Sequence, residues 1–64
     1  MNQAARVKAE WESKTHTRSI RAIAKENGVR TRDEDAGMVF YHFEDGSVLG
    51  TKGRARAHQV WVVK

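Results

Sequence analysis

A cluster of cations lies in the segment KGRAR, residues 52–56. Lys52, Arg54 and Arg56 alternate there, so in an extended backbone all three side chains point the same way. Three cations on one side of a β-turn can straddle a phosphate backbone or enter a groove of a nucleic acid. The same residues also suit a charged turn that keeps the chain soluble and protects a sheet edge from unwanted pairing.

A second set of cations lies in the N-terminal half. Arg18, Arg21 and Lys25 follow one another at i, i+3 and i+7, which is one stripe of a helix. The net charge is +4, and the whole excess of positive charge lies in residues 1–33. A solvated helix surface would carry such charges too. Because a basic face attracts polyanions, we predict a small basic nucleic-acid-binding domain. We expect DNA rather than RNA as its ligand, and a regulatory role is compatible with this prediction. Its phosphate contacts would be Arg18, Arg21, Lys25, Arg30, Arg32, Lys52, Arg54 and Arg56.

Histidine is the third residue type that could do chemistry. His42 and His58 lie on two expected strands and could approach each other on one face, where they would form an acid–base pair for RNA cleavage. No residue pattern supplies a nucleophile or a carboxylate that orients either ring. His16, His42 and His58 also lack the spacing of a zinc site. We therefore expect no enzyme, no metal site and no cofactor.

Two helical segments are expected to position the N-terminal cations. Residues 2–13 and 18–27 both show apolar residues at helical spacing. The two apolar stripes would fall on opposite sides of one straight helix, which a domain of 64 residues could not bury. Thr15 and Thr17 are suitable N-caps for a new helix. We predict two helices, with one continuous helix as the alternative.

The second helical segment and its end carry a family resemblance. In Ser19–Val29, SIRAIAKENGV, apolar Ile20 and small Ala24 are followed four residues later by Gly28. This stretch resembles the first half of a helix-turn-helix DNA-binding motif. The resemblance implies that a recognition helix follows and enters the major groove, with the C-terminal hairpin as a wing. Residues 30–37, RTRDEDAG, depart from that pattern through their acidic triplet and Gly37.

A sheet is expected in the C-terminal half. Residues 30–37 have no apolar periodicity and are predicted to form a loop, whereas Asp45-Gly46 between apolar runs predicts a hairpin turn. The predicted strands are 38–43, 47–51 and 55–63. The sequence thus predicts one α+β domain over residues 1–64, with two short helices packed on a three-stranded antiparallel sheet in the order α-α-β-β-β. It is helical over 2–27 and forms a β-hairpin or meander over 38–63.

Both faces of the predicted sheet are apolar, although the helices can cover only one. The uncovered face indicates a second function, that of a small phage-type inhibitor or adaptor that binds another protein, and it also suits a homodimer. The predicted contact residues are Tyr41, Phe43, Trp61 and Val63, or on the opposite face Met38, Phe40 and Val62.

Composition excludes several other classes. The chain has no Cys, so disulfides and cysteine zinc sites are excluded. Its apolar runs are far shorter than the roughly 18 residues that a membrane span needs. The N-terminus has no apolar signal-peptide core, and we expect a cytoplasmic protein without a membrane partner.

Overall fold

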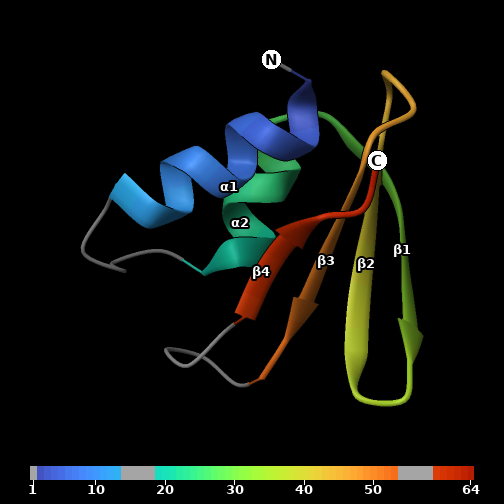
Figure 1. The fold of residues 1–64 in the computed structure, drawn as a ribbon. Helices are drawn as coiled ribbons and strands as arrows, with labels where there is room; N and C mark the ends of the chain where they lie inside the picture. Colours follow the sequence, from blue (N-terminus) through green and yellow to red (C-terminus); the bar gives the residue numbers. More distant parts are fainter. Residues whose placement is uncertain (1, 14–18, 54–58) are drawn as a thin grey trace.

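Two helices lie on one face of a four-stranded antiparallel sheet, and no described residue outside the sheet covers the other face (Figure 1). The computed structural model describes residues 2–13, 19–53 and 59–64. The strand order in the sheet is the same as the order along the chain, so the sheet is a meander. The elements are α1 (Gln3–Ser13), α2 (Ile20–Glu26), β1 (Val29–Asp35), β2 (Met38–Phe43), β3 (Val48–Lys52) and β4 (Gln59–Val62).

The prediction of two separate helices is confirmed. Helix α1 buries Ala4, Val7 and Trp11, which recur at helical spacing on one side. It packs on α2 and over strands β2, β3 and β4, whereas α2 lies over β1. Each helix therefore covers a different part of the sheet.

Helix α2 begins and ends at residues with clear capping chemistry. The Ser19 hydroxyl accepts a hydrogen bond from the backbone N–H of Ala22 at 3.1 Å, so Ser19 is the N-cap. The expected caps, Thr15 and Thr17, lie outside the described residues. Gly28 follows the helix with φ of +88°, the left-handed conformation that glycine commonly adopts just past a helix end.

The prediction of a loop over residues 30–37 is wrong, because most of this segment is strand β1. The sheet consequently has four strands and the order α-α-β-β-β-β, not the predicted three-stranded order. Among the described strands, β1 lies at the edge and pairs only with β2, and every residue of β1 after Val29 is exposed. Its pairing depends on backbone hydrogen bonds, which need no apolar side chains, so hydrophobic periodicity could not reveal it.

The predicted turn at Asp45-Gly46 is confirmed. Gly46 has φ of +88°, and its backbone N–H donates to the Phe43 carbonyl at 3.0 Å. Strand β3 begins and ends one residue later than predicted. Strand β4 lies within the predicted segment 55–63, part of which falls outside the described residues.

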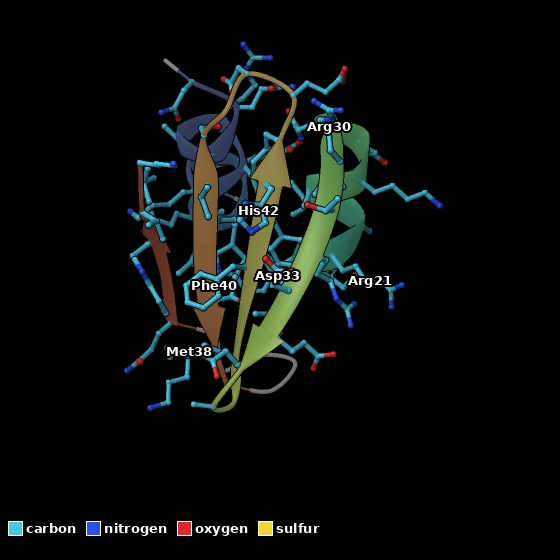
Figure 2. All side chains as sticks on the ribbon, turned by 90° about the vertical axis from the view of Figure 1, so that its right-hand side faces the viewer. Arg21, Arg30, Asp33, Met38, Phe40 and His42 are labelled. Atoms are coloured by element: carbon cyan, nitrogen blue, oxygen red, sulfur yellow. The ribbon has the colours of Figure 1, made fainter. Side chains whose placement is uncertain are left out.

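The hydrophobic core lies between the helices and the covered face of the sheet. From the sheet, Tyr41, Phe43 and Leu49 are buried in it, and Val39 and Val60 pack against its edge. The opposite, uncovered surface is called the open face below. Neighbours in the strand register share a face, which places Met38, Phe40 and His42 of β2 on the open face (Figure 2).

Candidate functional site

A groove lies between α2 and the edge strand β1. It encloses about 540 Å³ and is lined by Ser19, Arg21, Ala22, Lys25, Val29, Arg30, Thr31, Arg32 and Tyr41. Four of these residues are cations that the sequence predicted as phosphate contacts. Figure 2 shows Arg21 and Arg30 on the side of the molecule where α2 and β1 lie. The fold therefore brings half of the predicted contacts together on one surface, which is called the cationic groove below.

Local structure explains how the four cations reach the groove. Helix α2 buries Ile23 and Ala24, so Arg21 and Lys25, one helical turn apart, remain exposed. On β1, Arg32 pairs with Tyr41 and so lies on the helix-covered side of the sheet.

Arg30 reaches the groove through an irregularity in β1. The register with β2 shifts between Val29 and Thr31, which leaves Arg30 as the extra residue of a β-bulge. A bulge re-aims the side chain that it carries, and Arg30 accordingly lines the groove together with Arg32.

Few carboxylates neutralise the cationic groove. Arg32 Nη2 lies 3.2 Å from Glu34 Oε2, and both side chains are exposed enough for water and salt to screen the pair. For Arg21, Lys25 and Arg30, no ion pair is formed with any carboxylate of the described residues. The groove thus presents an excess of positive charge to solvent.

The cations of the groove affect the pKa of Tyr41, the only tyrosine of the chain. Burial raises the pKa of its phenol above the ordinary value of 10.0, and the charges of Arg32 and Arg21 oppose that rise. The phenol lies against the groove and is almost fully buried. Its ionisation therefore reports on the charge in the groove.

The open face carries a pair of aromatic rings. Phe40 and Trp61 pack edge to face, with ring centroids 6.3 Å apart and ring planes at 86°. The indole of Trp61 lies against the backbone of Gly50, since a Cβ added there would come 2.6 Å from Cζ2 and 2.7 Å from Nε1. Gly50 is a residue of strand β3 whose missing side chain makes room for Trp61.

A hydrogen bond between histidine and aspartate also lies on the open face. Nε2 of His42 is 2.7 Å from Oδ2 of Asp33, and the two side chains point toward each other in Figure 2. Sequence reasoning missed this carboxylate because it placed Asp33 in a loop. Strand alternation of Thr31, Asp33 and Asp35 was the available signal. No group of three or more metal-ligating side chains gathers among the described residues.

The remaining predicted contacts are divided between different places. Arg18, Arg54 and Arg56 lie outside the described residues, as do His16 and His58. Lys52 lies on the open face two strands away from β1, and so does not line the cationic groove.

The predicted protein interface is also split. Tyr41 and Phe43 are only 4% and 3% exposed and belong to the core, so they cannot form a contact surface. Trp61 pairs with Gly50 across the sheet and lies on the open face with Phe40, and strand alternation places Val63 there too. Val62 pairs with Leu49 and so lies on the helix-covered side.

The stretch that resembles a helix-turn-helix comprises α2 and the turn at Gly28. The chain continues from that turn directly into β1. No helix of the described residues is long and apolar enough to cross a membrane. Comparisons with protein-family models, with curated proteins and with solved structures found no match to this chain.

Proposed function

We propose that the protein binds nucleic acid through the cationic groove between α2 and β1. The observation that carries this proposal is the convergence of Arg21, Lys25, Arg30 and Arg32 on one concave surface. Guanidinium groups donate in pairs to phosphate oxygens, so three arginines and a lysine form a surface suited to a phosphate backbone. A cytoplasmic location, where such a ligand is abundant, is part of the same proposal.

The binding should depend strongly on salt. Each phosphate that a cation neutralises releases counterions and adds about 0.9 to the slope of log affinity against log salt on duplex DNA. Four contacts predict a slope of about −3 to −4. A protein that binds through such contacts alone shows little preference for base sequence.

A binding titration with a matched charge control tests the proposal. Fluorescence anisotropy with labelled random-sequence duplex DNA and single-stranded RNA, at low and moderate salt, gives affinity and slope. Arg30→Glu in the groove is compared with Arg6→Glu, which makes the same change in net charge at an exposed arginine of α1 that does not line the groove. We expect a marked loss for Arg30→Glu and a small one for Arg6→Glu. Absence of binding at low salt contradicts the function, and equal losses contradict the site.

The phenol of Tyr41 gives an independent readout. A polyanion seated in the groove would offset the charges of Arg32 and Arg21, which hold the pKa of Tyr41 down. Addition of a short oligonucleotide should therefore raise that pKa further. Binding without any change in the Tyr41 titration would place the nucleic acid elsewhere on the surface.

A second candidate function is the binding of a protein through the open face. The observation that favours it is the aromatic pair of Phe40 and Trp61 on the face that neither helix covers. Aromatic residues are enriched at the centres of protein interfaces. The two functions use different surfaces, so one substitution on each surface separates them.

A further inference from the structure

The open face is organised in rows that run across the strands. In one row, Asp35 of β1 pairs with Met38, which pairs with Lys52, which pairs with Gln59 of β4. Since cross-strand partners share a face, these side chains lie in line across the sheet.

A second row follows two residues further along each strand. It contains Asp33, Phe40, Gly50 and Trp61. In both rows the β1 edge is acidic. The first row also places a lysine on the opposite half of the sheet, and the centre of the face between the two edges is apolar. Figure 2 looks onto this arrangement, with Phe40 and Asp33 at about the same height and Met38 toward the lower end of the sheet.

Of the two-fold axes that run along or across the strands, the one along the strands makes this pattern complementary to itself. A two-fold axis parallel to the strands lays β1 of one copy over β4 of the other, so that Asp35 faces the half of the sheet with Lys52 and Gln59. A two-fold axis across the strands lays β1 over β1, so that the acidic edges of the two copies face each other. Like charges opposed in this way cost free energy, whereas opposite charges favour the pairing.

We propose that a second copy of this chain covers the open face, related to the first by a two-fold axis parallel to the strands. The two sheets would then form an aligned sandwich with the helices on its outer sides. The indole of Trp61 would lie opposite Asp33 of the other copy, whose Oδ2 contacts His42 of its own chain and whose other carboxylate oxygen could accept from the indole N–H. This inference deepens the second candidate function and does not depend on the cationic groove.

The size of the face sets the expected affinity. Strand spacing and rise make a face of four strands and a few rows roughly 20 Å in each direction. When two such faces pack together, each chain buries less accessible surface than the approximately 800 Å² per partner of a standard interface. We therefore expect a reversible dimer, with a dissociation constant on the order of tens of micromolar or weaker.

Sedimentation equilibrium and translational diffusion by NMR, from about 5 µM to about 1 mM chain, measure this association. The wild-type chain should pass from monomer to dimer over that range, and Trp61→Lys should weaken the dimer at least about tenfold. Circular dichroism confirms that the variant is folded. Arg30→Glu, outside the open face, should leave association unchanged.

An exchange of charges between Asp35 and Lys52 tests the proposed direction of the two-fold axis and leaves Phe40 and Trp61 unchanged. Asp35→Lys and Lys52→Asp should each weaken the dimer several-fold, and the double variant should restore it. Within one chain the two residues are separated by β2, so their own attraction contributes little. A chain that stays monomeric at the highest concentration overturns the inference, as does a dimer that Trp61→Lys leaves intact. Either result leaves nucleic-acid binding by the groove untouched.

Discussion

Gln3 and Asp45 form two hydrogen bonds with each other. The backbone N–H of Gln3 donates to Oδ2 of Asp45 at 2.8 Å, and the backbone N–H of Asp45 donates to Oε1 of Gln3 at 2.8 Å. Beside them, the backbone N–H of Ala4 donates to the Ser47 hydroxyl at 3.0 Å. The turn between β2 and β3 thus supplies two of the acceptors that the first turn of α1 lacks within its own helix.

Replacement of Asp45 by alanine should lower the melting temperature, because the N–H of Gln3 loses its acceptor and the turn loses its contact with Ser47. Glu44→Ala, at the exposed neighbouring residue of the same turn, is the control. Differential scanning calorimetry measures both. Equal melting temperatures for the two variants would show that the cap does not stabilise the fold.

The same cap predicts a dependence on pH. The Ser47 hydroxyl, followed by the backbone N–H groups of Gln3 and Ser47, lowers the pKa of Asp45 below its ordinary value of 3.8. A carboxyl with a lowered pKa in the folded state stabilises it fully above the unfolded pKa, and this stabilisation is lost as the pH falls through the folded pKa. The advantage in melting temperature of wild type over Asp45→Asn should therefore be largest near neutral pH and shrink below pH 3.8. An advantage that stays constant with pH would contradict this assignment.

Gly50→Ala should disrupt the open face. The added methyl group would meet the Trp61 indole, and the ring would have to move away from the sheet and from Phe40. We expect a loss of about 1–3 kcal/mol in the free energy of unfolding. Urea denaturation measures the loss, and the Trp61 indole N–H resonance in NMR reports the displacement. Gly37→Asn is the control, since nothing lies within 4 Å of a Cβ there and asparagine tolerates its φ of +81°.

Leu49→Ala should cost far more than Val62→Ala, although the two residues are partners across β3 and β4. Leu49 is 0% exposed within the core, whereas Val62 is 36% exposed at its edge. A cavity at Leu49 should cost about 2–5 kcal/mol of unfolding free energy, and truncation of Val62 below about 1 kcal/mol. Similar costs in chemical denaturation would contradict the packing described.

Arg32→Ala should raise the pKa of Tyr41, because the arginine is the main charge that stabilises the phenolate. An ultraviolet titration follows this single tyrosine directly. Arg6→Ala, on α1 and outside the groove, should leave the titration unchanged. A Tyr41 titration that is the same in both variants would show that the phenol does not sense the groove.

Hydrophobic periodicity predicted the elements that bury a face and missed the one that does not. Both helices and the positions of β2 and β3 to within a residue followed from that signal, and the Asp-Gly pair predicted the turn between the two strands. Hydrophobic periodicity did not reveal strand β1, because the residues of this edge strand after Val29 are exposed and show no apolar pattern. The cation types of the groove were therefore predictable, but their convergence was not, because it requires β1 to pair with β2.

The sequence also could not predict which face of the sheet each aromatic side chain lies on. Alternation within one strand gives relative directions, and only the register between strands tells which sets share a face. The predicted combination of Tyr41 with Trp61 therefore rested on an unknown register. In the structure Trp61 pairs with Gly50 and so lies beside Phe40.

The cap on α1 also bears on the order in which the chain can fold during synthesis. Gln3 and Asp45 are 42 positions apart, so the residues of the first helix are synthesised well before the acceptors that cap it. An isolated helix of 11 residues is only marginally stable in water. Helix α1 should therefore stay unstable until the turn at Asp45 and strand β3 are available to cap and cover it, and proteases should cleave α1 readily in a chain truncated before that turn.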